Sequence, residues 1–129
     1  MSMESQILKG HTSSVRSVAL SSNGTFIVSG SSDKSVRLWN ALSGGLPKVF
    51  LGHTDIVWSV ALSSDGTHIV SGSDDNSVRV WDALNGVVLN VLNGHIDSVW
   101  SVAFSSNGTH IVSGSSHKSV CVEQDAWST

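Results

Sequence analysis

The chain has 129 residues and a net charge of −3, and charged residues make up only 13% of it. Its few Lys and Arg residues are scattered, so we expect no nucleic-acid partner and no anionic membrane partner. No run approaches the roughly 20 apolar residues of a membrane helix, and the start MSMESQILKG lacks the pattern of a signal peptide. Cys121 is the only cysteine, which excludes an internal disulfide and a cysteine-based zinc site. These features favour an intracellular protein of the cytoplasm, with the nucleus as the alternative.

The segment that begins at Gly10-His11 begins again at Gly52-His53 and at Gly94-His95, so the period is 42 residues both from His11 to His53 and from His53 to His95. A fixed period in this range is typical of repeat architectures. The chain therefore divides into an N-terminal strand that completes another blade, two full repeats, and a degenerate third repeat that lacks its fourth strand. The corresponding ranges are 1–9, 10–51, 52–93 and 94–129.

The first repeat predicts four short strands, because its apolar and β-branched residues come in short runs without helical spacing. Asn23-Gly24 separates the first two runs, and this pair favours a hairpin because both residues tolerate positive φ. Pro47 comes at the start of the last run, where its missing N–H is harmless. Four antiparallel strands in 42 residues predict an all-β fold of propeller blades. The predicted strands are Val15 to Leu20, Thr25 to Val28, Ser35 to Trp39 and Lys48 to Leu51.

The first two repeats run GHTSSVRSVALSSNGTFIVSGSSDKSVRLWN and GHTDIVWSVALSSDGTHIVSGSDDNSVRVWD. With Gly-His at the front and Trp-Asn or Trp-Asp at the back, they resemble the WD-repeat (WD40) family of β-propellers over residues 10–122. The resemblance implies a non-enzymatic protein-interaction scaffold in which each blade holds a hydrogen-bonded structural tetrad. A half-buried Asp needs donors and a buried indole N–H needs an acceptor, so such a tetrad is physically reasonable. The matching residues are His11, Ser29, Asp33 and Trp39, then His53, Ser71, Asp75 and Trp81.

Ser29, His11 and Asp33 could also be drawn as a hydrolase triad. The same grouping occurs twice with identical spacing, and nothing in the sequence suggests an exposed nucleophile or an oxyanion hole. The structural reading is therefore preferred, and we expect no catalytic residues.

A metal site could be imagined from the three remaining histidines, which are His68, His110 and His117. The first two occupy one repeat position, so they belong to separate blades. We interpret them as solvent-facing strand residues, and we expect no metal and no cofactor.

The third repeat departs from the pattern near its end. It keeps His95 and Ser113, but His117 stands at the Asp position and Glu123 at the Trp position. A buried carboxylate without partners would be costly. We expect the end of this blade to be frayed, or the chain to be a diverged or truncated piece of a longer array.

Three repeats cannot close a propeller, which usually has 4–8 blades. Gln6 to Lys9 precedes Gly10-His11 as Val49 to Leu51 precedes Gly52-His53, so it is predicted to be a spare fourth strand. Two chains would be complementary and would give six blades, covering apolar faces and open strand edges. The competing interpretation is a fragment of a six- to eight-bladed protein.

Family resemblance places partner binding at the residues three and five positions after each repeat His and at the residue before each tetrad Asp position. None of these positions holds one residue type in all three repeats, whereas Val15, Val57 and Val99 are identical. Trp and Arg are enriched at binding hot spots, so we expect a protein or peptide partner. The alternatives are ordinary strand-start residues, a ligand- or glycan-sensing segment of a larger receptor, and a fragment without a function of its own. The nine candidate residues are Ser14, Arg16, Ser32, Ile56, Trp58, Asp74, Ser98, Trp100 and Ser116.

Overall fold

The computed structural model describes residues 6–43, 45–116 and 118–124, and these ranges contain eleven β-strands. No helix in this part of the chain is long and apolar enough to cross a membrane. The strands are β1 (Val15–Leu20), β2 (Phe26–Ser31), β3 (Val36–Asn40), β4 (Lys48–Phe50), β5 (Val57–Leu62), β6 (His68–Ser73), β7 (Val78–Asp82), β8 (Val88–Leu92), β9 (Val99–Phe104), β10 (His110–Ser115) and β11 (Val120–Gln124).

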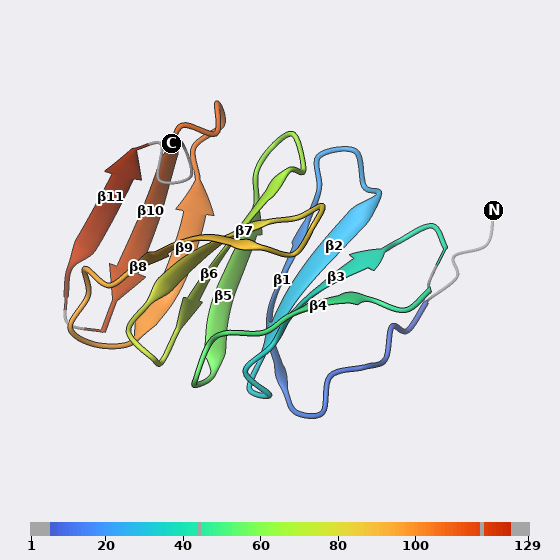
Figure 1. Cartoon of the computed structure of the whole chain (residues 1–129), viewed down its shortest axis with the longest axis horizontal. Coiled ribbons are helices and arrows are strands. Elements are labelled where there is room, and N and C mark those ends of the chain that lie inside the picture. The colour runs from blue at the N-terminus through green and yellow to red at the C-terminus, as the bar shows by residue number, and fades with distance from the viewer. Residues whose placement is uncertain (1–5, 44, 117, 125–129) are drawn as a thin grey trace.

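The strands form three antiparallel sheets, in which each strand pairs with its neighbour in sequence. The first two sheets have the orders β1-β2-β3-β4 and β5-β6-β7-β8, and the third contains β9, β10 and β11. Figure 1 shows the three sheets in a row, with β1 to β4 at one end of that row and β9 to β11 at the other. This arrangement confirms the predicted all-β architecture of propeller blades.

The strand boundaries follow the sequence closely at β1 and less closely afterwards. β2 continues to Ser31 rather than ending at Val28, because Ser29 and Gly30 pair with β1 on one side and with β3 on the other. β3 is shifted one residue forward from its predicted position, and β4 ends one residue before Leu51. Gly24 has φ of +74° in the turn between β1 and β2, as the Asn-Gly signal predicted.

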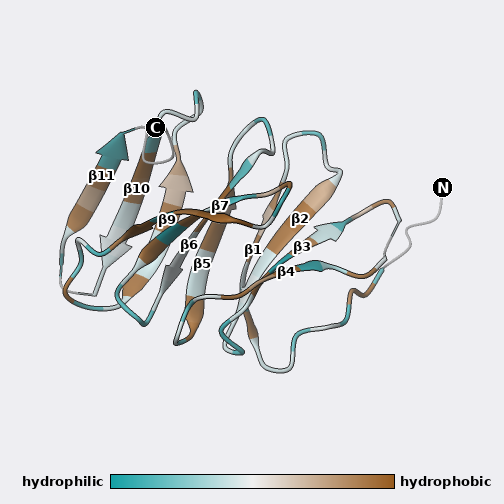
Figure 2. Ribbon diagram, viewed as in Figure 1, coloured by the Kyte–Doolittle hydropathy of each residue, from teal (hydrophilic) through white to brown (hydrophobic). Residues whose placement is uncertain are grey.

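Neighbouring blades pack through a valine pair of one sheet and a glycine of the preceding one. A Cβ atom added to Gly30 would lie 2.7 Å from Cγ1 of Val57 and 2.9 Å from Cγ1 of Val60. The same arrangement recurs at Gly72, where Val99 Cγ1 would be 2.7 Å away. A residue larger than glycine at position 30 or 72 would force these valines, and with them the neighbouring blade, to shift. Figure 2 shows that apolar residues concentrate in the strands, whereas the loops are largely polar.

Serines at equivalent repeat positions form hydrogen bonds between neighbouring blades. The hydroxyl of Ser17 accepts from the N–H of Val60 over 3.2 Å, and Ser59 accepts from Val102 at the same distance. At the hairpin turns, the hydroxyl of Ser22 donates to the carbonyl of Ser64 over 2.8 Å, and Ser64 in turn donates to Ser106 over 3.2 Å. The recurrent serines therefore take part in the packing of one blade on the next.

The N-terminal segment differs from the sequence expectation within the single chain. Residues 6–14 contain no strand, and Ile7 is exposed. Gln6 to Lys9 therefore does not form a strand within the single chain. The strand with which it was expected to pair belongs to another copy. Its pairing remains a prediction about assembly.

The third blade keeps its register further than expected. β11 pairs with β10 through Gln124, and Glu123 lies opposite Ile111 as Trp39 lies opposite Ile27 in the first blade. The predicted fraying is therefore not seen up to Gln124. His117 and residues 125–129, on which part of that expectation fell, lie outside the described residues.

Candidate partner-binding face

In the first blade the predicted tetrad residues form a directed chain of hydrogen bonds. The Trp39 indole N–H donates to Ser29 Oγ over 2.8 Å, and this hydroxyl lies 2.6 Å from His11 Nε2. His11 Nδ1 lies 2.8 Å from Asp33 Oδ2. A carboxylate only accepts, so Nδ1 carries a hydrogen, and in the neutral form of the ring Nε2 accepts from the serine. Ser35 also donates to Asp33, through its hydroxyl over 2.6 Å.

The second blade repeats this geometry around a more buried histidine. His53 Nε2 lies 2.6 Å from Ser71 Oγ and His53 Nδ1 lies 2.8 Å from Asp75 Oδ2. Burial lowers the pKa of His53, and this effect outweighs the opposing influence of Asp75. Burial by itself raises the pKa of Asp75, but hydrogen bonds, chiefly from Ser77 and His53, bring it down to about 2. The histidine is therefore neutral and the aspartate is charged near neutral pH.

The third blade holds its histidine with serines alone among the described residues. His95 Nε2 lies 2.8 Å from Ser113 Oγ, as in the other blades. His95 Nδ1 lies 3.2 Å from the hydroxyl of Ser119. Ser119 occupies the repeat position of Ser35 and Ser77, whose hydroxyls lie 3.3 Å and 3.4 Å from the corresponding nitrogens. The sequence did not single out Ser119, although its repeat position could have identified it.

The tetrads tie together the loops that carry the candidate binding residues. Asp33 accepts from the backbone N–H of Thr12 over 3.0 Å, which joins the turn after β2 to the loop before β1. The Ser31 hydroxyl adds a bond to the carbonyl of Ser14 over 2.9 Å. Ser29 is only 3% exposed and its oxygen is already engaged by two partners. Such a hydroxyl is poorly placed to attack a substrate, because a nucleophile must be reachable.

Arg16, Trp58 and Trp100 each occupy a β-bulge. In β1 the register passes from Val15 opposite Ser31 to Ser17 opposite Gly30, so Arg16 is an extra residue without an opposite partner. The registers of β5 and β9 skip Trp58 and Trp100 in the same way. A bulge bends a strand and redirects one side chain, and bulges are frequent beside functional sites. In all three blades the Arg or Trp side chain of a type enriched at binding hot spots therefore projects from an equivalent β-bulge.

The nine candidate residues lie as three groups of three, one group in each blade. Within each group the residue before the tetrad Asp position bonds through its backbone N–H to the carbonyl of the first residue. These bonds are Ser32 to Ser14 at 2.9 Å, Asp74 to Ile56 at 2.9 Å and Ser116 to Ser98 at 3.1 Å. The structure therefore brings the members of each group together at the starts of β1, β5 and β9, the first strands of the three blades.

Side chains connect these groups across the blades. The Arg16 guanidinium lies 5.1 Å from the centre of the Trp58 ring and donates to the Ser32 hydroxyl over 2.7 Å. The Trp58 indole N–H donates to the Asp74 carboxylate. Trp58 and Trp100 then line a purely apolar hollow between the second and third blades. Trp58 is half-buried, whereas Trp100 is 59% exposed. The face therefore combines an anchored ring with a freely accessible one.

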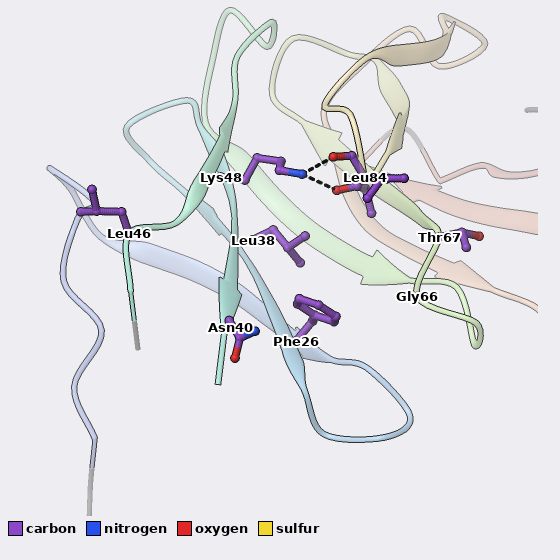
Figure 3. A pocket seen from close by; sticks show the side chains of 9 residues that line it. Phe26, Leu38, Asn40, Leu46, Lys48, Gly66, Thr67 and Leu84 are labelled. Carbon is purple, nitrogen blue, oxygen red and sulfur yellow. Dashed lines mark hydrogen bonds between the residues drawn. The ribbon is translucent and has the colours of Figure 1, made fainter. Parts of the chain in front are cut away.

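A second hollow lies between β2, β3 and β4 of the first blade and two turns of the second blade, and the sequence analysis did not foresee it. Its volume is about 380 Å³, and apolar side chains from β2, from β3 and from the loop before β4 line much of it. Figure 3 shows Phe26 and Leu38 facing this space, with Lys48 reaching across it. Lys48 Nζ donates to the carbonyls of Ala83 and Leu84, so its charge bridges the blades. Leucine in two loop-like segments, Leu46 in SGGLP and Leu84 in ALNG, is the sequence signal that could have indicated it.

The described residues contain no group of three His, Cys, Asp or Glu side chains that could hold a metal ion. His68 Nδ1 and His110 Nδ1 each lie 2.8 Å from the hydroxyl of the preceding threonine, on β6 and β10 respectively. They thus belong to different blades, and His117 lies outside the described residues.

Comparison with known proteins gives one family. The model described as "WD domain, G-beta repeat" matches the chain three times, over residues 3–40, 44–82 and 86–122. Similar proteins include the "Ribosome biogenesis protein BOP1 homolog" of Drosophila erecta, 45% identical over 42 residues, and that of Drosophila grimshawi, 48% identical over 42 residues. Each alignment covers 33% of this chain and 5% of the relative. The likeness therefore amounts to about one repeat.

Proposed function

The chain belongs to the WD-repeat (WD40) family, whose domains are protein-interaction scaffolds, and we propose that it binds a protein or peptide on the face that carries Arg16, Trp58 and Trp100. The observation that supports this most directly is the apolar hollow between Trp58 and Trp100. Both rings project from bulges, and exposed aromatic surface of this kind is enriched at interaction hot spots.

The chemistry of the face favours an apolar or aromatic side chain flanked by a basic one. The hollow offers the faces of two indoles, which suit stacking and burial of apolar groups. Asp55 and Asp97 directly precede face residues, are exposed, and are anchored by hydrogen bonds from the following backbone N–H groups at 2.8 Å. A Lys or Arg next to the inserted side chain would meet these carboxylates.

The named relatives agree with an intracellular, non-enzymatic role. Their printed name places them in ribosome biogenesis. We carry over from this only that the chain works inside the cell as a binding module, in the cytoplasm or nucleus.

A binding screen with matched variants tests the proposed face. The wild type, Trp100→Ala and Leu84→Ala are applied to a peptide array and to a glycan array. Leu84 is exposed like Trp100 but lies in the turn between β7 and β8, outside the face. We expect peptide signals that Trp100→Ala reduces by about tenfold or more, in the hot-spot range, and that Leu84→Ala leaves unchanged. Signals confined to glycans, or equal loss in both variants, would contradict the proposal.

We also propose that two chains associate into a six-bladed ring. Gln6 to Lys9 of one chain would pair with the segment Ser119 to Val122 of the other, which includes the start of β11, and supply the fourth strand of its third blade. The exposed Val120 and Val122 on β11 support this, because an open apolar strand edge is a liability in solution. Light scattering over a range of concentrations should report twice the chain mass. A folded monomer at every concentration would refute the ring.

A further inference from the structure

The two end blades each expose one half of a contact that the chain makes twice internally. On β5 and β9 the paired valines are buried against the preceding blade, with Val57 0% and Val60 5% exposed. The same repeat positions on β1 are Val15 and Val18, and they are 51% and 66% exposed. The first blade therefore exposes two valines whose equivalents in the other blades are buried against a neighbouring blade.

The opposite end presents the matching socket. Gly30 and Gly72 receive valines so closely that an added Cβ would clash at 2.7 Å. Gly114 holds the same repeat position on β10, and nothing lies within 4 Å of the place where its Cβ would be. The third blade thus carries the glycine surface on which valines of a following blade fit.

The hydrogen bonds between neighbouring blades follow the same 42-residue repeat as the valine–glycine contacts. Val60 and Val102 donate their N–H groups to Ser17 and Ser59 of the preceding blade. The next members of this series are Ser101 as acceptor at one end of the chain and the N–H of Val18 as donor at the other. The apolar and the polar parts of the contact therefore continue in register past both ends.

We infer that the outer face of β1 in one copy docks on the outer face of β10 in a second copy, with Val15 and Val18 over Gly114 and with Val18 bonded to Ser101. The occupant is a second copy because each of the two faces matches one side of the contact that neighbouring blades make inside the chain. This inference rests on the proposed self-association. The contact is head to tail, so it closes into a ring when the rotation between blades permits and otherwise extends into an open array. Two copies give six blades, within the range that propellers use.

The internal contacts show how to trap this docking covalently. A Cβ on Gly30 would lie 3.4 Å from Cβ of Val57, and one on Gly72 would lie 3.3 Å from Cβ of Val99. Disulfides join Cβ atoms roughly 3.5–4.5 Å apart, so a small adjustment suffices. The experiment therefore mixes Val15→Cys with Gly114→Cys, each in a Cys121→Ser background, under mild oxidation by oxidised glutathione.

The mixture should give a disulfide-linked dimer on a non-reducing gel, whereas either variant alone should give at least tenfold less. Leu84→Cys mixed with Gly114→Cys controls for random collision, because Leu84 lies in the middle blade and is 83% exposed, more than the 51% of Val15. A double variant that carries both Val15→Cys and Gly114→Cys in one chain then shows, by the size of its cross-linked products, whether two chains close into a ring. A dimer limit supports both the docking and the ring, while a ladder of larger species supports the docking and refutes the two-chain ring. Cross-linking no stronger than the collision control would overturn the docking itself.

A second variant keeps the test independent of cysteine chemistry. Val18→Asp changes a side chain that is 66% exposed, so the single chain should still fold. It places a charge in the apolar contact and should weaken self-association at least tenfold in sedimentation. Leu84→Asp is the matched control and should leave association unchanged. A Val18→Asp protein that associates like the wild type would overturn the inference, even if the wild type is a dimer through another surface.

Discussion

Trp81 donates its indole N–H to Ser71 Oγ over 2.9 Å, and the same oxygen lies 2.6 Å from His53 Nε2. One hydroxyl thus satisfies a buried donor and a buried acceptor. The ring of Trp81 also packs edge-on against Phe50, with centroids 5.6 Å apart. The tetrad of the second blade is therefore attached to the core between the first and second blades, and its polar members can be tested through stability.

Ser71→Ala should destabilise the protein by about 1–3 kcal/mol, because it leaves the indole N–H of Trp81 and a histidine nitrogen without partners in a buried site. Ser113→Ala is the matched control in the third blade, where the hydroxyl serves His95 and Glu123 stands at the Trp position. It should cost clearly less. Urea unfolding of both variants measures the difference, and an equal loss would show that the indole bond contributes little.

Trp81→Ala should cost about 3–5 kcal/mol, as large core truncations do. Trp81 is 2% exposed and belongs to the core cluster around Phe50. Trp100→Ala should change stability by less than about 0.5 kcal/mol, since an exposed side chain outside the core contributes little to folding. Thermal melts followed by circular dichroism compare the two variants. If Trp100→Ala melts as early as Trp81→Ala, the aromatic face is a part of the core and the proposed binding site is wrong.

Stability should fall in two stages as the pH is lowered. The pKa of His53 in the folded chain lies below its ordinary value of 6.5. Its contribution is therefore complete above pH 6.5 and is lost as the pH falls below that value. The pKa of Asp75 is lowered from 3.8 to about 2, so its contribution is lost between these two values. Urea midpoints measured from pH 8 to pH 2 should decline in both windows.

Asp75→Asn provides the control for the acid stage. The variant lacks the titrating carboxylate beside His53 and Ser77, so its urea midpoint should depend less on pH between 4 and 2 than that of the wild type. A midpoint that rises as the pH falls from 7 to 5 would contradict the assigned direction for His53, whose charged form is also disfavoured by Arg79.

Much of the fold follows from the sequence because its signals are local. The 42-residue period predicts repeated blades, and the apolar run from Val15 to Leu20 matches β1 residue for residue. Asn23-Gly24 predicts the first turn because glycine readily adopts positive φ, and Gly24 does so, whereas Asn23 does not. The end of β2 at Ser31 was less accessible, since Ser29 and Gly30 carry no strand pattern and are held by pairing on both sides.

The sequence by itself determined the blade repeat, the order of the strands and the residues that stand at equivalent positions. Only the tertiary structure decided that Arg16, Trp58 and Trp100 are bulge residues, because a bulge depends on the register between two strands. It also decided the hollow between the two indoles and the close fit of valine on Gly30. Those distances join residues far apart along the chain, and they are set by the way in which one sheet packs on the next.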